Sequence, residues 1–226
     1  MEPAVVCHFR KADIVVSVRE ADIADVDQGF QLRRVGIALR LYGLPFAHRP
    51  LSVFGDGEAV RALNPLMRVP VLLLEDGTAL VDSHMILDHL DGRADVPLFP
   101  RSEPGRTAAL RVAALACGLA EKAVSLFYER RLHEVTSPVW EARCAAQIGS
   151  VLTALEAERA ARPGPWWFGA QLGHADIALA CALRFASDAH PGLITLADYP
   201  ALAAHSAAAE AMAVFAEISQ PFVAPA

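Results

Sequence analysis

The sequence lacks the features that mark several classes of protein. Lys and Arg together number 20 against 26 Asp and Glu, the formal net charge is −6, and no basic stripe is present. We therefore expect no nucleic-acid partner. The apolar run of residues 108–120 is interrupted by Arg111 and is too short to cross a bilayer. The first 16 residues contain no hydrophobic stretch of signal-peptide length. These absences predict a cytoplasmic protein with no membrane partner.

Cysteine is also scarce. The four cysteines, Cys7, Cys117, Cys144 and Cys181, form no C-x-x-C pair, and their spacing suits neither a disulfide framework nor a zinc site. We interpret them as buried thiols of a protein in a reducing compartment.

The first hundred residues alternate short β-rich runs with helical patterns. In order, they predict a strand at 13–18, a helix at 30–43 ended by Gly43, a strand at 44–52, a short helix at 56–63, a hairpin at 69–83 with an Asp-Gly turn, and a helix at 83–92.

The rest of the chain is rich in alanine and reads as almost wholly helical. It predicts four helices, at 105–133, 138–162, 174–188 and 199–217. The segment 95–106, with three prolines and a glycine, is typical of a linker. We therefore expect one domain at 1–94 and a second at 107–226. A chain of this length buries enough surface to fold without staples.

Two short motifs suggest a binding site. X-Pro is the peptide bond for which cis is accessible, and a cis Val69–Pro70 bond would turn the N–H and C=O of Val69 outward, toward an extended peptide. Asp82 and Ser83 open a predicted helix, where free N–H groups favour an anion. Ser83 could hold a carboxylate while Asp82 accepts from an ammonium. The alternatives are an edge-strand proline at Pro70 and a simple helix N-cap at Ser83.

Three segments in this order resemble the cytosolic glutathione transferase family. They are NPLMRVPVL at 64–72, LVDSHMILDHL at 80–90 and FGAQLGHADIALACALRF at 168–185. The similarity covers about residues 30–215. The resemblance implies an α/β, thioredoxin-like N-terminal domain followed by an all-helical C-terminal domain.

The resemblance also implies a ligand. Glutathione would be the co-substrate, held by Arg68, Val69, Pro70, Asp82 and Ser83, with a small apolar electrophile as the second substrate. A homodimer is the usual assembly in the family.

In the third segment Asp176 resembles the family's buried helix-start aspartate, but Gly173 stands where a Ser or Thr would complete a capping box. We expect Asp176 to be structural, at the start of a helix that lacks half of its cap.

The chain departs from the family at the start of its first helix, where a Ser, Cys or Tyr hydrogen-bonds the glutathione sulfur. If Phe30 matches the aromatic residue of the family's Ser-Pro-aromatic entry, Gln28 occupies the catalytic position. An amide can still donate to sulfur, so Gln28 is the positional candidate. Nearby negative charges would raise the pKa of a forming thiolate, and three acidic residues precede Gln28: Asp22, Asp25 and Asp27. The alternative is that Asp27 only caps the helix.

Further candidates concern the electrophile and metal ions. The helix over 119–132 would line the electrophile pocket in the family, so Lys122 and Leu126 are predicted to lie there, with Tyr128 as another candidate. Phe30, at the entry of the first helix, is also predicted to be a pocket residue. His84 and His89 stand five residues apart and so do not share a helix face as metal ligands four apart would. We therefore expect no metal.

Two functional hypotheses stay open. The first is an enzyme that transfers glutathione to a small apolar electrophile, or uses it for reduction or isomerisation. The second is a non-catalytic glutathione-binding protein, or a scaffold with a vestigial site. Residues 19–30 separate these hypotheses, because they carry the atypical helix entry.

Overall fold

The computed structural model describes residues 12–15, 29–49, 51, 53–74 and 76–219. Within them a four-stranded mixed sheet has the order β2-β1-β3-β4. The strands are β1 (Ala12–Val15), β2 (Phe46–Arg49), β3 (Val71–Leu73) and β4 (Ala79–Val81). β1 pairs parallel with β2 and antiparallel with β3, and β3 pairs antiparallel with β4. The predicted Asp-Gly hairpin is confirmed, with Gly77 at φ +84° in its turn.

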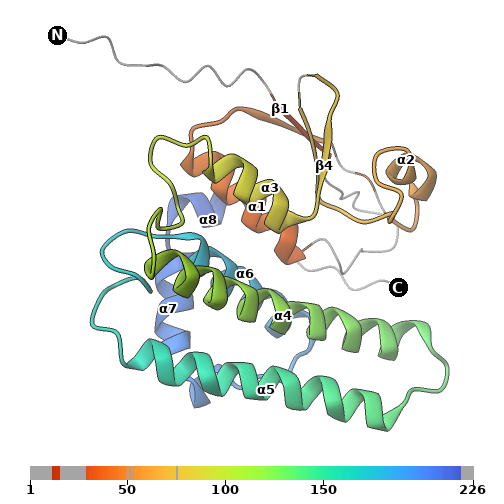
Figure 1. The fold of residues 1–226 in the computed structure, drawn as a ribbon. Coiled ribbons are helices and arrows are strands. Elements are labelled where there is room, and N and C mark those ends of the chain that lie inside the picture. Colours follow the sequence, from red (N-terminus) through yellow and green to blue (C-terminus); the bar gives the residue numbers. More distant parts are fainter. Residues whose placement is uncertain (1–11, 16–28, 50, 52, 75, 220–226) are drawn as a thin grey trace.

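Three helices accompany the sheet. They are α1 (Gly29–Leu41), α2 (Gly57–Arg61) and α3 (Ser83–Asp91). α1 and α3 lie between the sheet and the long helices that follow α3 in the chain (Figure 1), and they share an apolar cluster with Leu72 of β3. Gly43 follows α1 with φ +67°, the left-handed conformation expected of a glycine that ends a helix.

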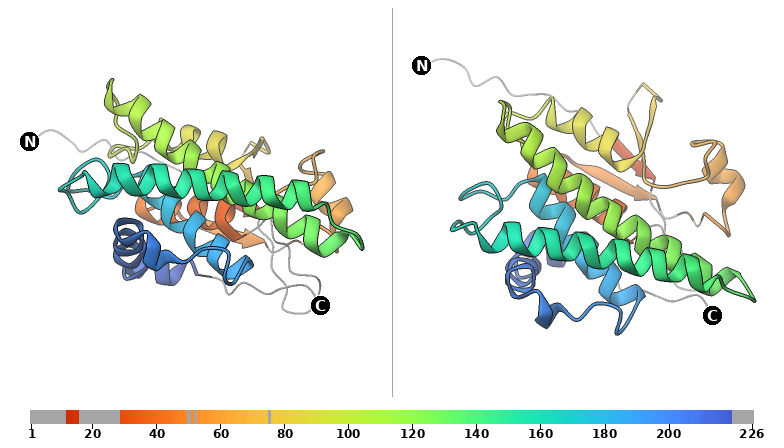
Figure 2. Two further views of the ribbon diagram at one scale, coloured as in Figure 1. Left: turned by 90° about the horizontal axis from the view of Figure 1, so that it is seen from below. Right: turned by 60° about the horizontal axis from the view of Figure 1, so that its bottom comes forward.

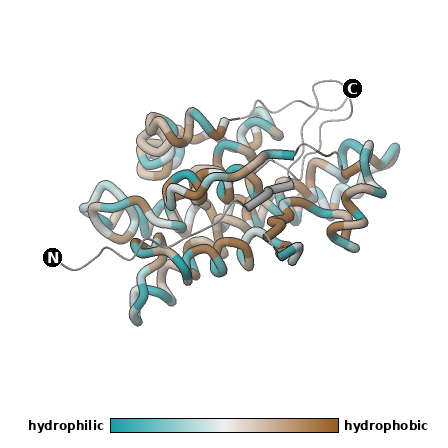
Figure 3. Tube along the Cα trace, turned by 90° about the horizontal axis from the view of Figure 1, so that it is seen from above, coloured by the Kyte–Doolittle hydropathy of each residue, from teal (hydrophilic) through white to brown (hydrophobic). Residues whose placement is uncertain are grey.

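The helical part forms the second layer. Its elements are α4 (Gly105–Leu132), α5 (Pro138–Ala160), α6 (His174–Ala189), the short 3-10 helix η2 (Leu196–Asp198), α7 (Pro200–Glu210) and α8 (Ala213–Glu217). α4 and α5 run side by side along their length (Figures 1 and 2). α6 is buried on nearly all sides, as expected of a core helix whose alanines permit close packing. In Figure 3 hydrophobic stretches recur along the helices in the middle of the molecule.

Asp176 organises the start of α6, as expected of a structural residue. Its carboxylate accepts hydrogen bonds from the N–H of Gly173 (2.8 Å) and the N–H of Trp167 (2.7 Å). Gly173 has no side chain to return the bond, so only the Asp176 half of the capping box exists. A Cβ at position 173 would lie 2.8 Å from the carbonyl oxygen of Leu98. A Ser or Thr side chain at this position would therefore press against the carbonyl of Leu98.

Behind Asp176 lies a buried histidine. Nε2 of His205 is 3.3 Å from Oδ1 of Asp176, and Nδ1 of His205 accepts from Nε of Arg159 at 3.1 Å. Burial, together with the positive charge of Arg159, lowers the pKa of His205 to about 4. Burial raises the pKa of Asp176. His205 is therefore neutral at physiological pH.

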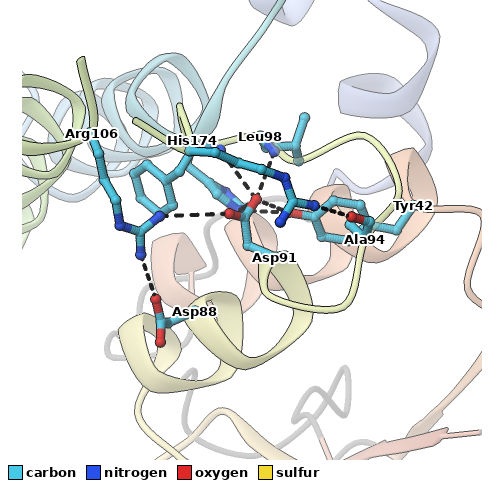
Figure 4. Close-up of polar contacts among 9 residues, drawn as sticks. Tyr42, Asp88, Asp91, Ala94, Leu98, Arg106 and His174 are labelled. Atoms are coloured by element: carbon cyan, nitrogen blue, oxygen red, sulfur yellow. Dashed lines mark hydrogen bonds and ion pairs between the residues drawn. The ribbon is translucent and has the colours of Figure 1, made fainter. Parts of the chain in front are cut away.

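A polar junction connects the sheet layer to the helical layer (Figure 4). Oδ1 of Asp91, at the end of α3, accepts from the hydroxyl of Tyr42 (2.8 Å) and from the N–H of Leu98 (2.6 Å). The same hydroxyl lies 2.9 Å from Nε2 of His174 on α6, and Arg106 of α4 reaches Oδ2 of Asp91 at 4.0 Å. Asp91 thus fixes the linker between helices of both layers.

The prediction of a single fourth helix over 199–217 is wrong. The helical conformation is interrupted at Met212, whose ψ of 139° is extended, so the structure has two helices, α7 and α8, in place of one. The break turns α8 onto α1, where the guanidinium of Arg33 binds both carboxylate oxygens of Glu210 (2.6 and 2.7 Å) and the carbonyls of Phe215 and Ile218. These contacts tie the end of the described chain to the first helix.

Candidate functional site

A loop at residues 64–70 leads into β3 and is held by Asn64, which is buried. Nδ2 of Asn64 donates to the carbonyl of Arg68 (2.7 Å), and Oδ1 accepts from the N–H of Leu66 (3.0 Å). The carbonyl of Asn64 also accepts from the N–H of Met67 (2.8 Å). Asn64 therefore fixes the peptide that precedes Val69. In a sequence, an Asn-Pro pair such as Asn64–Pro65 indicates only a turn, so these hydrogen bonds could not be foreseen.

The N–H and C=O of Val69 are the main-chain groups of interest in this loop. The Val69–Pro70 bond is cis, as expected. Val69 is buried, and neither its N–H nor its C=O forms a hydrogen bond with another described residue. The ladder begins two residues later, where Val71 pairs with Val81. No described residue therefore occupies the N–H and C=O of Val69, and an extended peptide added beside this residue could form hydrogen bonds with both.

Asp82 and Ser83 begin α3 at the same end of the β3–β4 ladder, because Val81 pairs with Val71. Asp82 is the N-cap: its Oδ1 accepts from the N–H of His84 at 2.8 Å. The alternative of Ser83 as N-cap is therefore wrong, since Ser83 is the first helical residue. Asp82 is exposed and Ser83 is buried. The two motifs that the sequence singled out are thus neighbours in space.

A buried arginine, which none of the sequence motifs contains, lies beside Ser83. Nη1 of Arg34 is 3.5 Å from Oγ of Ser83 and 2.6 Å from Sγ of Cys117 on α4. Arg34 is four residues after Phe30 and three before Ile37, both apolar core residues of α1. A cation on the apolar face of a helix was the signal available in the sequence.

The first turn of α1 carries no hydroxyl or thiol side chain in the described residues, since it starts with Gly29, Phe30, Gln31 and Leu32. Gln28 lies outside the described residues, as do the three preceding aspartates. A Cβ at Gly29 would lie 2.9 Å from the ring of Phe185. The assignment of Gln28 as the activating residue stays a prediction.

The predicted electrophile-pocket residues differ in how far they are exposed. Phe30 is 1% exposed and packs on the ring of Phe185, with 5.8 Å between ring centroids, and Leu126 is fully buried. Lys122 is partly exposed, with its Nζ 6.0 Å from the centroid of the Trp140 ring. Phe30 and Leu126 would have to be uncovered to touch a substrate, so their role stays a prediction.

The described part of the chain holds no group of three or more His, Cys, Asp or Glu side chains arranged for a metal ion. Nδ1 of His89 lies 2.9 Å from Nη1 of Arg93 rather than toward His84. Among the helices of the described residues, none has the length and apolarity that a membrane span needs.

Comparisons with known proteins agree with this geometry. Two family models match: the N-terminal domain of glutathione S-transferase over residues 28–101, and its C-terminal domain over residues 138–208. Among solved structures, a glutathione S-transferase from Methylobacterium radiotolerans, in complex with glutathione sulfonate, has a TM-score of 0.84 at 29% identity, covering 96% of this chain and 98% of that chain. One from Methylobacillus flagellatus, with glutathione bound, has a TM-score of 0.81 at 25% identity, covering 95% and 100%.

Two curated relatives are maleylacetoacetate isomerases. The protein from Mus musculus is 26% identical over 195 residues, which cover 83% of this chain and 86% of that protein. The protein from Pseudomonas aeruginosa is 41% identical over 88 residues, 36% of this chain and 42% of that protein. The match to this second relative thus spans less than half of its length.

The sheet with its covering helices and the helical layer define a thioredoxin-like domain followed by a helical domain, so the expected fold class is confirmed. The chain belongs to the glutathione S-transferase family.

Proposed function

We propose that this chain binds glutathione between the Val69–Pro70 turn and the start of α3, and uses the bound thiol on a small apolar electrophile. One observation carries the proposal. Peptide groups of Val69 that no other described residue pairs, and a helix N-terminus with Asp82 and Ser83, meet at one end of the same hairpin. Glutathione offers an extended peptide and an α-amino acid head, which match these two features. The structural relatives in complex with glutathione sulfonate and with glutathione support this choice.

Each group has a separate role in binding. The N–H and C=O of Val69 pair with the cysteinyl residue of the tripeptide, as an added strand would. The hydroxyl of Ser83 and the free N–H groups of the first turn of α3 bind the γ-glutamyl carboxylate. Oδ1 of Asp82 is used in the cap, so Oδ2 accepts from the ligand's ammonium. Arg68 comes directly before Val69, and the hydrogen bond from Asn64 to its carbonyl holds this part of the loop in position for binding.

The chemical step rests on the thiolate. A helix N-terminus lowers the pKa of a nearby thiol, and α1 supplies one at Gly29. Gln28 is the candidate donor to the sulfur. Transfer, reduction and isomerisation all begin from the thiolate, and isomerisation of maleylacetoacetate is the first reaction to assay, because two relatives carry that name.

A second candidate function is glutathione binding without catalysis. It is favoured by one observation: the described first turn of α1 has no hydroxyl or thiol to activate the sulfur. Turnover measurements with glutathione and maleylacetoacetate, and with a chloronitrobenzene, separate the two functions. Activity above that of free glutathione supports the enzyme, and binding without such activity supports the second candidate.

We also propose a cytoplasmic homodimer with a role in detoxification. The family supports the dimer, and light scattering of the purified protein tests it. Three free cysteines in the described residues, Cys117, Cys144 and Cys181, are consistent with a reducing compartment.

The domain limits 1–94 and 107–226, with the linker at 95–106, are part of the same proposal.

Calorimetric titration with glutathione tests the binding site. Ser83→Ala is expected to weaken binding about tenfold or more, because it removes a hydrogen bond to a charged group. Ser150→Ala is the matched control, since Ser150 is an exposed residue of α5 and should bind as the native protein does. No heat from the native protein up to millimolar glutathione would rule out the proposed function.

A further inference from the structure

Arg34 carries a charge that the described residues do not neutralise. It is 1% exposed, on the face of α1 that meets α3 and α4. No described carboxylate lies within ion-pair distance of its guanidinium, and its buried Nε has no hydrogen-bond partner. The neighbouring Arg33 differs, because Glu210 binds it through both carboxylate oxygens.

Among the described residues, the two groups hydrogen-bonded to Arg34 are both uncharged. Ser83 offers a hydroxyl at 3.5 Å, and Cys117 offers a sulfur at 2.6 Å. Burial raises the pKa of the Cys117 thiol, although the charge of Arg34 opposes this shift, so the thiol stays protonated at neutral pH. An unpaired buried cation is costly, and an anion bound close by would offset that cost.

We propose that Arg34 supplies the positive charge that selects the α-carboxylate of the ligand's amino acid head at Ser83. The inference rests on the proposed function. A carboxylate hydrogen-bonded to Oγ of Ser83 would lie on the order of 6 Å from the guanidinium, a range at which charges interact strongly in a buried setting. Arg34 then attracts the α-carboxylate and Asp82 accepts a hydrogen bond from the ammonium. The site therefore selects a zwitterionic amino acid head over an acyl group that lacks either charge.

A cycle that changes the protein and the ligand together tests this proposal. The protein change is Arg34→Gln, and the ligand change replaces glutathione by 4-aminobutyryl-cysteinylglycine, which lacks only the α-carboxylate. We expect Arg34→Gln to raise the Kd for glutathione by about 10- to 100-fold and the Kd for the analogue by less than about threefold. Arg40→Gln, on the same helix at an exposed pair with Glu217, is the matched control and should change neither Kd.

Each outcome decides between the possible roles. Equal weakening of both ligands by Arg34→Gln would show that Arg34 only supports the fold, and would overturn the proposal. Arg34→Lys keeps the charge and is the variant to use if Arg34→Gln does not fold. It should retain the native preference for glutathione over the analogue, and a folded Lys variant without that preference would overturn the proposal as well. Absence of glutathione binding by the native protein would instead refute the proposed function, and this inference with it.

Discussion

Replacing Gly173 by alanine tests how tightly the linker is pressed against the start of α6. The backbone of Gly173, with φ −129°, is open to alanine, so any cost comes from contact rather than from conformation. The added Cβ would meet the carbonyl oxygen of Leu98 at 2.8 Å, whereas ordinary contacts begin at 3.4 Å. Leu98 cannot easily retreat, because its N–H is bound to Asp91 and its carbonyl accepts from the N–H of His174 at 3.0 Å.

The expected loss of stability follows from these contacts. Overpacking of this kind costs about 1–3 kcal/mol, and the stiffer unfolded chain of the alanine variant returns about 0.4–1 kcal/mol. We expect a net loss of about 1–2 kcal/mol, which lowers Tm by roughly 2–8 °C for a chain of this size. Differential scanning calorimetry measures the change.

A matched variant should move in the opposite direction. Gly118 lies inside α4, and a Cβ there would meet nothing within 4 Å. Gly118→Ala should therefore raise stability by about 0.5–1 kcal/mol through helix propensity. If Gly173→Ala proved as stable as the native protein, the close packing of the linker on α6 would be refuted.

Three further predictions concern separate parts of the molecule. The pKa of His205 is about 6.5 in the unfolded chain and about 4 in the folded protein, so the unfolded state binds more protons and stability falls as pH decreases. Between about pH 7.5 and about pH 5, the free energy of unfolding of the native protein, measured by denaturant titration, should fall by about 2 kcal/mol more than that of His205→Gln. Arg33→Ala should cost about 2 kcal/mol, because it removes two charge-assisted hydrogen bonds from the partly buried Glu210, which keeps only a longer ion pair with Arg184 at 3.8 Å. Arg40→Ala should cost less than about 1 kcal/mol because its ion pair is exposed. Asn64→Asp, which removes the donor to the carbonyl of Arg68, should weaken glutathione binding roughly tenfold in calorimetry while keeping the bond to Leu66.

Each of these has a result that counts against it. Identical pH slopes for the native protein and His205→Gln would show that this histidine is not responsible. Equal losses for the two arginine variants would mean that the contacts of α8 with α1 contribute little. Unchanged affinity in Asn64→Asp would show that the loop keeps Val69 in place without this bond.

Most helices and strands could be predicted from local patterns. The Asp-Gly turn, Gly43 after α1 and the alternation of apolar residues act over a few neighbouring residues, and the structure has them where the sequence placed them. The break at Met212 could not be predicted, because residues 199–217 are rich in alanine and favour a helix throughout. Burial of Phe215 and the bonds from Arg33 decide that break, and those partners are distant in the sequence.

The candidate site shows the same division. The Val69–Pro70 and Asp82-Ser83 pairs could be found in the sequence, because each carries its own chemistry and both border one predicted hairpin. Arg34 and Asn64 were missed, since an arginine in a helix is usually solvated and an Asn-Pro pair usually marks only a turn.

The sequence by itself determined most of the helices and strands, the family and the two candidate binding motifs, because periodicity, turn residues and motif spacing are properties of neighbouring residues. Only the tertiary structure placed Arg34 beside Ser83, pressed Leu98 against Gly173, and turned α8 onto α1. Those contacts join residues that are 49 to 185 positions apart, and their free energy exists only once the layers have packed.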